Sequence, residues 1–203
     1  MNEINRNKVF KIENYSFKNY TLLSRDWEKI VLSWRNHPEN RKWMLNNNEI
    51  SWNEHLKFIE DLKISSNRYY CLVIKDFEPI GSIDFVNIDY NEKTAEIGYF
   101  LAPEKQGSGL GLEFIFYAFK FAFDILGFNV IQGNVMDSNK IAYALNAFLG
   151  FKYLHQHIKV INGKRILFHY CEITKEDFFK NVETKNDINY FIQFYKNIQY
   201  GNS

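Results

Sequence analysis

Three glycines at alternate positions mark the segment of this chain with the clearest chemical potential, Gln106-Gly107-Ser108-Gly109-Leu110-Gly111. Glycine has no Cβ atom, so the backbone N–H groups of such a loop can close around a phosphate. The strongly apolar run that follows predicts a helix to Leu126, and its positive N-terminal end would add to the attraction. The segment therefore predicts a site for a diphosphate-bearing cofactor. An ordinary strand-to-helix turn is the alternative.

The elements that must position this loop are readable from periodicity and capping signals. Helices are predicted where apolar residues recur at helical spacing behind a cap, including a capping box at Ser51 and Glu54. Strands are predicted where apolar and polar residues alternate between turn residues. The expected helices are 26–36, 52–64, 110–126 (ended by Gly127), 139–149 (ended by Gly150), one from Thr174, and Asp187–Gln199. The expected strands are 20–23, 68–75, 79–90, 94–101, 128–135 and the hairpin 153–161 with 164–173, with turns at Glu78-Pro79, Tyr90–Lys93 and Asn162-Gly163.

Length and composition favour one globular α+β domain built on a central mixed, mostly antiparallel sheet flanked by helices. We expect the main domain to span residues 1–180 and a C-terminal helical appendage to span 181–203. The chain has 203 residues, 46% hydrophobic residues and a formal net charge of +1, which suit a globular protein and give no basic footprint for nucleic acid or a membrane.

The two cysteines and the N-terminal residues indicate the cellular location of the protein. Cys71 and Cys171 lie in apolar strand-like runs, which favours buried free thiols, and their number is too small for a metal site. The first eleven residues are polar, and no stretch is long and apolar enough to span a membrane. We therefore expect a cytoplasmic protein with no metal.

The order of these motifs resembles the GNAT superfamily of acyl-CoA N-acyltransferases from about Phe17 to Ile173. Ala95-Glu96-Ile97-Gly98-Tyr99-Phe100-Leu101 is similar to the family's fourth strand, and Gln106-x-x-Gly109-x-Gly111 to its pyrophosphate loop. Asn139-x-x-Ala142, with Gly150-Phe151 after the helix, is similar to its second cofactor motif. The resemblance implies acetyl-CoA as co-substrate.

Two branches of this family compete for the chain. Glu96-Ile97-Gly98-Tyr99 with Gln106-Gly107-Ser108-Gly109 resembles the ribosomal-protein N-terminal acetyltransferases. Trp34-Arg35-Asn36-His37-Pro38, Trp43-Met44, His55-Leu56-x-Phe58-Ile59 and Gly81-Ser82-Ile83-Asp84-Phe85 look closer to the branch that acetylates the 4-amino group of a UDP-linked amino sugar in pseudaminic acid synthesis. We favour the second branch.

The resemblance implies a cofactor role for residues at the two motifs. The fourth strand would splay from the fifth near Tyr99, Phe100 and Leu101, whose backbone would pair with pantetheine. Backbone N–H groups of Gln106–Gly111 would hold the pyrophosphate. Asn139, close to Ala142, would bond the pantetheine arm, or would serve only as a helix N-cap.

The acceptor side is expected to combine a base with aromatic and cationic residues. Glu96 is the first candidate for the base, acting directly or through water, and a surface or ion-paired glutamate is its alternative. Asp84 on the neighbouring strand is the second candidate, while His155 and His157 are weaker ones. The N-terminal segment would bind a nucleotide sugar by stacking and by contacts to the diphosphate, although its tryptophans could equally be core residues. Its candidate residues are Trp34, Arg35, His37, Arg41, Trp43 and Met44.

One position departs from the family pattern. Many GNAT enzymes have a tyrosine seven residues after the motif asparagine, as general acid for the thiolate, and here Asn146 stands in that place. Tyr143 could substitute from one turn earlier, Asn146 could steady the sulfur while water supplies the proton, or protonation is undemanding, since a free thiol has a pKa near 8.5. We favour the role for Asn146.

The function expected from the sequence is therefore acetyl transfer to a small nucleotide-sugar amine, by a protein that could form a homodimer. One alternative is an N-terminal peptide acetyltransferase, which would need an open acidic groove. The other is a non-catalytic acyl-CoA-binding protein, because Asn146 stands where many GNAT enzymes have their general acid.

Overall fold

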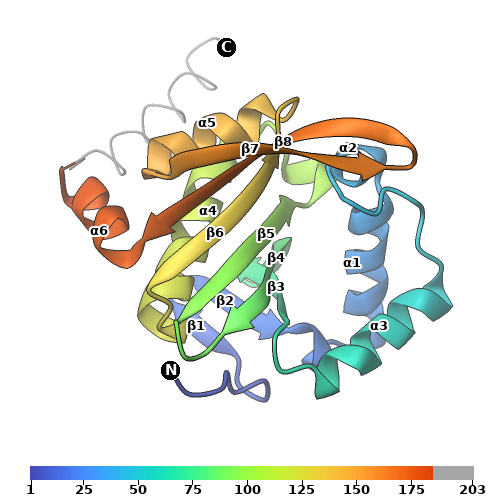
Figure 1. Cartoon of the computed structure of the whole chain (residues 1–203). Helices are drawn as coiled ribbons and strands as arrows, with labels where there is room; N and C mark the ends of the chain where they lie inside the picture. Colours follow the sequence, from blue (N-terminus) through green and yellow to red (C-terminus); the bar gives the residue numbers. More distant parts are fainter. Residues whose placement is uncertain (185–203) are drawn as a thin grey trace, which may run out of the picture.

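A single eight-stranded sheet carries the fold, in the computed structural model that describes residues 1–184 (Figure 1). The strand order is β1-β2-β3-β4-β5-β6-β8-β7, with β5 and β6 parallel and every other neighbouring pair antiparallel. This arrangement confirms the predicted α+β fold with a mixed, mostly antiparallel sheet. The strands are β1 Phe10–Ile12, β2 Tyr15–Asn19, β3 Tyr69–Lys75, β4 Glu78–Asp89, β5 Thr94–Leu101, β6 Val130–Met136, β7 Lys152–Ile161 and β8 Lys164–Thr174.

Helices cover the sheet unequally on its two faces. The larger core lies under α4, the π-helical turn that continues it and α6, where phenylalanines of these helices meet β1 to β6 and β8. A smaller core lies where α1 and α3 meet β3. The helices are α1 Arg25–Asn36, α2 Pro38–Arg41, α3 Trp52–Ile64, α4 Leu110–Lys120, α5 Lys140–Leu149 and α6 Lys175–Thr184, with 3₁₀ turns at Tyr20–Leu22 and Pro103–Lys105 and the π-helical turn at Phe121–Leu126.

Most predicted boundaries are confirmed by the capping contacts that set them. Ser51 and Glu54 form the predicted capping box at the start of α3. Asn139 caps α5 through its side-chain oxygen, and Gly150 ends that helix in the left-handed region at φ 101°. The Asn162-Gly163 turn joins β7 to β8, both residues having positive φ.

Two local predictions are wrong. Tyr20–Leu22 is a 3₁₀ turn and not a strand, because the Asn19 side chain accepts the Thr21 N–H and starts a turn there. The strand lies just before it as β2, which pairs with β1 and β3, and both β1 and β2 were missed. The turn between β3 and β4 is at Asp76-Phe77, which have φ values of 50° and 69°, so Glu78-Pro79 already belongs to β4.

Other expectations concern the cysteines, the membrane and the C-terminus. Cys71 and Cys171 are buried free thiols, as predicted. No helix within residues 1–184 is long and apolar enough to cross a membrane. Helix α6 runs through the domain boundary expected at residue 180. The helix expected over Asp187–Gln199, and with it most of the 181–203 appendage, lies outside the described residues.

Candidate active site

The parallel strands β5 and β6 separate along their length. They pair only from Thr94 with Val130 to Glu96 with Gln132, although β5 continues to Leu101 on its β4 side. Within the described chain, the β5 edge from residue 97 to residue 101 therefore faces a gap and not a strand. This splay is the geometry expected around Tyr99, Phe100 and Leu101, and it leaves backbone groups that an extended amide-bearing chain can pair with.

The glycine loop meets the start of α4 beside this gap. Gly109 is the N-cap of α4 at φ 81°, and no described side chain caps that helix. Ser108 instead bonds the Lys105 carbonyl at 2.6 Å, so its hydroxyl stabilises the loop. The same hydroxyl accepts the Leu110 N–H at a long 3.4 Å, and the following N–H groups of the first turn are directed out of the helix, which suits a phosphate. A splayed strand edge joined to an uncapped helix start fits the pantetheine and diphosphate of coenzyme A.

The Gln106 side chain fastens this loop to the rest of the molecule. Its amide donates to Asn40 Oδ1 at 2.6 Å and to the Leu101 carbonyl at 3.3 Å. Asn40 is buried and donates in turn to the carbonyls of Trp34 and Leu101. Sequence reasoning missed Asn40, for which a polar residue inside a short helical turn gave no signal.

Helix α5 places three predicted residues near the gap in different ways. Asn139 uses its side-chain oxygen to accept the Ala142 N–H at 3.1 Å, as an N-cap does. Asn146 is 3% exposed and accepts a hydrogen bond from the Tyr99 hydroxyl at 3.1 Å. Tyr143 stacks on Tyr153, with ring centroids 4.1 Å apart, so its ring lies against the outer strand β7. The structure therefore brings Asn146 to Tyr99 and directs Tyr143 toward a different strand.

Two carboxylates lie on the opposite face of β4 and β5 from this helix. Asp84 is opposite Gly98 in the strand register, and a Cβ atom at Gly98 would lie 2.7 Å from both Asp84 oxygens, so the glycine makes room for the carboxylate. Glu96 accepts a hydrogen bond from Asn134 Nδ2 at 2.9 Å. Burial and the nearby charge of Glu96 raise the pKa of Asp84 to about 7.

Two hydrogen-bond acceptors beside Glu96 have no internal donor to match them. The Asp84 carboxylate has no hydrogen-bond donor or cationic partner among residues 1–184. The Asn134 Oδ1 atom is buried and unpartnered in the same part of the chain. Sequence reasoning missed Asn134, whose signal was a polar residue on the same strand face as Gln132. Such a cluster can receive a group that carries several N–H donors.

The Trp34-Arg35-Asn36 motif is used to build the wall of the acceptor side. Trp34 is 6% exposed and packs in the smaller core. Arg35 donates to the backbone carbonyls of Asn46 and Asn48, and Asn36 exchanges two hydrogen bonds with the Ile50 backbone. Arg35 and Asn36 thus hold the segment between α2 and α3, and burial lowers the pKa of the Arg35 guanidinium.

The other predicted acceptor residues surround this segment. His37 caps α2 by accepting the Glu39 N–H, and Arg41 lies 3.6 Å from Glu49. Trp43 is 37% exposed and Met44 is half-buried. The structure does not bring these four side chains together at the two carboxylates.

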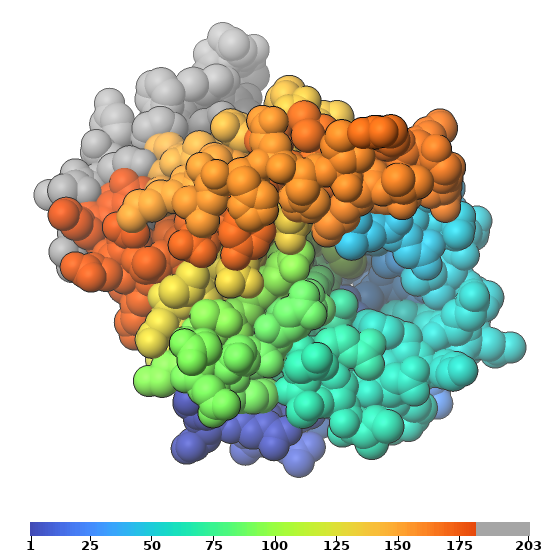
Figure 2. All heavy atoms as spheres, in the orientation of Figure 1, coloured from blue at the N-terminus to red at the C-terminus, as the bar shows by residue number. Residues whose placement is uncertain are grey.

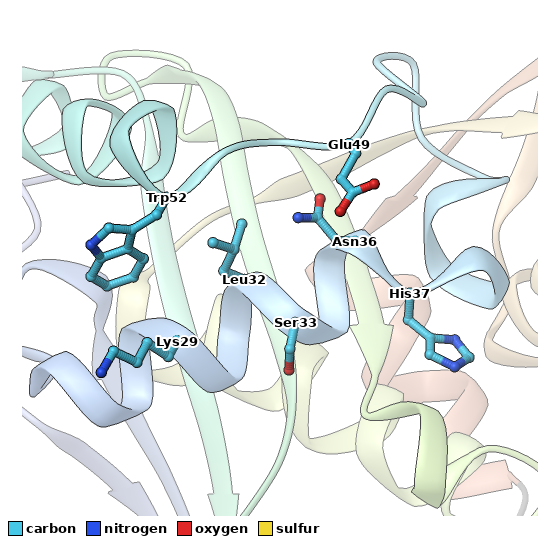
Figure 3. Close-up of a pocket in the computed structure, with 7 residues that line it drawn as sticks. All are labelled: Lys29, Leu32, Ser33, Asn36, His37, Glu49 and Trp52. Carbon is cyan, nitrogen blue, oxygen red and sulfur yellow. The ribbon is translucent and has the colours of Figure 1, made fainter.

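A groove of about 530 Å³ lies along the face of α1 that points away from the smaller core (Figure 3). Of the predicted site residues only His37 lines it, pointing outward at one end. The lining residues are Lys29, Leu32, Ser33, Asn36, His37, Glu49 and Trp52. The groove is therefore distinct from the cleft that contains Asp84 and Glu96.

The β7–β8 hairpin forms the remaining wall of the cleft. Figure 2 shows a hollow between this hairpin (orange), the green strands and the segment between α2 and α3 (cyan). At the hairpin tip, Asn162 Nδ2 donates to Asn47 Oδ1 at 2.7 Å and joins the two walls. His157 pairs with Phe168 in the register, and Lys159 lies over the Phe168 ring. Strand alternation puts both on the same face as Tyr170.

No cluster of His, Cys, Asp and Glu that could hold a metal ion occurs in the part of the chain that the structure describes. The site thus combines carboxylates on β4 and β5 with histidine and lysine on β7.

Comparison with known proteins identifies the family. The family described as acetyltransferase (GNAT) domain matches residues 21–152. A protein named acetyltransferase PseH from Campylobacter jejuni serotype O:2 is 32% identical over 154 residues, which is 76% of this chain and 90% of that protein. Its counterpart from serotype O:23/36 is 33% identical over 156 residues, with the same coverage.

Solved structures agree with these sequence relatives. The structure of C. jejuni N-acetyltransferase PseH in complex with acetyl coenzyme A is 28% identical, with a TM-score of 0.63, and covers 79% of this chain and 99% of its own. Spermidine N-acetyltransferase from Vibrio cholerae, in complex with CoA and spermine, has a TM-score of 0.73 over 83% of this chain and 99% of its own. At 20% identity the latter shows the fold alone.

The resemblance expected from the strand, loop and helix motifs is therefore confirmed, and so is the dependence on acetyl-CoA. The chain belongs to the GNAT acetyltransferase family and is an acetyl-CoA-dependent N-acetyltransferase with PseH relatives.

Proposed function

We propose that this enzyme transfers the acetyl group of acetyl-CoA to the 4-amino group of a UDP-linked amino-dideoxy sugar, in a pathway of the pseudaminic acid type. The observation that carries the proposal is the convergence of Asp84, Glu96 and Asn134 Oδ1 beside the splayed strands. The Asp84 carboxylate and the Asn134 amide oxygen, both without an internal donor and beside a second carboxylate, suit an amine that arrives as ammonium and must lose a proton before it attacks.

Glu96 is proposed to take that proton. Asn134 holds one Glu96 oxygen at 2.9 Å, which fixes the carboxylate, and the second oxygen has only a long contact of 3.4 Å to Asn87. Asp84 pairs with Gly98, two residue pairs along the sheet from Glu96, and its raised pKa leaves it partly protonated near neutral pH. A pKa near the operating pH suits proton transfer, so Asp84 stays the second candidate for the base, and its carboxylate can also bind the ammonium.

The hairpin end of the cleft supports an anionic group on the same acceptor. Lys159 supplies the positive charge on this face of the hairpin, and it has no acidic partner among the described residues. Burial, followed by the charges of Lys159 and His155, lowers the pKa of His157 and so favours its neutral form, which can still donate a hydrogen bond. A diphosphate bound by Lys159 and an amine bound by the two carboxylates would together match a nucleotide-linked amino sugar.

The N-terminal arginines are less suitable for the diphosphate. Arg35 is occupied by two backbone carbonyls and Arg41 lies near Glu49. We therefore propose that the hairpin, and not Arg35, contacts the diphosphate. Trp43 and Met44 remain the proposed contacts to the uracil ring of the nucleotide. The cytoplasmic location and the homodimer remain predictions.

The relatives support the sugar over a peptide acceptor, because both curated relatives bear the name PseH. The basic hairpin supports it too, since a positively charged peptide N-terminus would be repelled there.

The test is release of free coenzyme A from acetyl-CoA against a panel of acceptors. The panel contains UDP-4-amino-4,6-dideoxy sugars of both configurations, the matching dTDP-sugars, N-terminal peptides and a simple polyamine. We expect turnover on a UDP-amino sugar. Turnover on peptides or polyamine alone would contradict the proposal, and acetyl-CoA binding without any turnover would support the non-catalytic alternative.

A further inference from the structure

We propose that Tyr99 supplies the hydrogen-bond donor for the departing thiolate, in place of the tyrosine that position 146 lacks, and that Asn146 positions it. The proposal depends on acetyl transfer from acetyl-CoA and not on which amine accepts the group. It adds a side-chain role to a residue expected to act only through its backbone.

The first argument is the location of the Tyr99 side chain. Tyr99 belongs to the part of β5 that has left β6, and its hydroxyl still reaches Asn146 on α5 at 3.1 Å. The phenol therefore lies on the α5 side of the gap between the splayed strands. In an acetyl-CoA-dependent enzyme with this splay, the thioester must occupy that gap.

The second argument is the space left beside this pair. Gly133 on β6 has no side chain, and a Cβ atom there would lie 3.9 Å from Asn146 Nδ2 and 3.2 Å from Cys171 Sγ. A larger residue at 133 would thus fill the region next to Asn146. The glycine therefore leaves the Asn146 amide room to keep the orientation in which it accepts from the Tyr99 hydroxyl.

The third argument is that the other candidate phenol is occupied elsewhere. Tyr143 stacks on Tyr153 at 4.1 Å and meets the edge of the His169 ring. Among residues 1–184 the Tyr99 hydroxyl bonds only to Asn146, and rotation about the phenol C–O bond can redirect its proton. Burial raises the pKa of the Tyr99 phenol, so the group stays protonated and remains a donor over the working pH range.

The chemistry balances without a further reactant. The amine nitrogen forms a bond to the acyl carbon and gives up one proton to the carboxylate side, while the carbon–sulfur bond breaks and its electron pair goes to sulfur. The Tyr99 O–H stabilises that negative charge through a charge-assisted hydrogen bond. The thiolate then gains one proton from water, and the carboxylate returns one to solvent, so the tyrosine ends as it began.

A binding measurement separates this role from a structural one. A donor to the sulfur stabilises the thiolate of bound coenzyme A, so the pKa of the bound thiol falls below its free value. Coenzyme A affinity should then rise with pH up to the free thiol pKa, by about tenfold or more for a hydrogen bond to a charged group. Acetyl-CoA has no ionisable thiol and should not show this rise.

The experiment compares wild type, Tyr99→Phe and Tyr143→Phe by calorimetric titration with coenzyme A and acetyl-CoA from pH 6.5 to about 9. We expect Tyr99→Phe to lose the rise for coenzyme A, to bind acetyl-CoA within threefold of wild type, and to reduce kcat at least tenfold. Tyr143→Phe should keep the pH-dependent rise in coenzyme A affinity and the wild-type kcat. A pH-dependent rise retained in Tyr99→Phe, or a kcat above one third of wild type, would overturn the proposal.

The outcome is independent of the acceptor proposed above. The kcat ratio is measured with whichever amine the wild type acetylates, and the titrations need none. Failure of the sugar assignment would show in the wild-type panel, whereas failure of the Tyr99 proposal would show only in the variant. If Tyr99→Phe were poorly folded, Asn146→Ala should give the same loss of pH dependence in coenzyme A binding.

Discussion

The Tyr99 hydroxyl donates to Asn146 Oδ1 at 3.1 Å and so joins the splayed strand β5 to helix α5 across the gap between β5 and β6. Both residues were singled out from the sequence for separate reasons, one as backbone and one as a missing acid. Their contact turns the two observations into one feature of the site.

Replacing Asn146 should lower kcat without weakening the binding of acetyl-CoA. Asn146→Ala leaves the Tyr99 hydroxyl without its partner, so we expect kcat to fall about tenfold, which corresponds to about 1.4 kcal/mol. The Kd of acetyl-CoA, measured by calorimetry, should stay within threefold. A kcat above one third of wild type would count against the positioning role of Asn146.

Replacing the base candidate should reduce the rate more strongly. Glu96→Gln keeps the contact to Asn134 but cannot take a proton, so kcat should fall by about 10²-fold or more at saturating acetyl-CoA. Asn87→Ala is the matched control, because Asn87 has only the long 3.4 Å contact to the same carboxylate. If Glu96→Gln kept more than a third of the wild-type kcat, Glu96 would not be the base.

Asp84 should destabilise the fold above neutral pH. Its pKa is raised to about 7 in the folded protein, whereas an unfolded aspartate ionises near pH 3.9. Because the folded pKa is the higher one, stability is lost as the pH rises from about 4 to about 7, and stays low above that.

Asp84→Asn should remove this loss. We compare the free energy of unfolding of the variant with that of wild type at each pH. The difference, variant minus wild type, should be larger at pH 8 than at pH 4 by about 2–4 kcal/mol, after allowance for partial exposure. Urea titrations at the two pH values measure it. Equal differences at both would mean that Asp84 ionises normally.

The hairpin lysine should affect the affinity for an anionic acceptor. Lys159→Ala should raise the KM for the UDP-amino sugar about five- to tenfold and leave kcat nearly unchanged. Arg165→Ala removes the same charge from the opposite face of the hairpin and should change KM less than twofold. Equal effects of both variants would indicate general charge attraction and not a contact.

The arginine of the Trp-Arg-Asn motif should behave as a structural residue. Lysine cannot reproduce the two-carbonyl contact of Arg35, so Arg35→Lys should lower the free energy of unfolding by about 1–2 kcal/mol. The KM values for a nucleotide sugar and for a simple amine acceptor should then rise to a similar degree. A rise confined to the nucleotide sugar would show instead that Arg35 contacts the phosphates.

The sequence predicted the elements whose signals are local. The capping box at Ser51, the Asn139 cap and the Asn162-Gly163 turn each depend on residues within a few positions, and each is present. The strand expected over 94–101 is present with the same bounds. These features could be read because short-range hydrogen bonds fix them.

The parts that could not be predicted depend on contacts between distant residues. β1 and β2 are short, and the pairing of β2 with β3 joins distant residues, from Tyr15 with Lys75 to Asn19 with Cys71. Asn40, Asn134 and the Tyr99 hydroxyl gain their positions from partners on other elements. Trp34 matched a motif, yet only the packing of α1 against β3 decides that its ring lies in the core.

One exposed hydrogen bond between two asparagine amides, from Asn162 to Asn47, closes the cleft at the hairpin tip. A bond of this kind contributes about 1 kcal/mol net, which corresponds to only about a five-to-one preference for the joined state. A substantial minority of molecules would therefore have the tip released at any instant. Exchange of a bulky acceptor then needs no unfolding of the wall, and the rate of turnover can be set by the acyl-transfer step instead of by passage through the entrance.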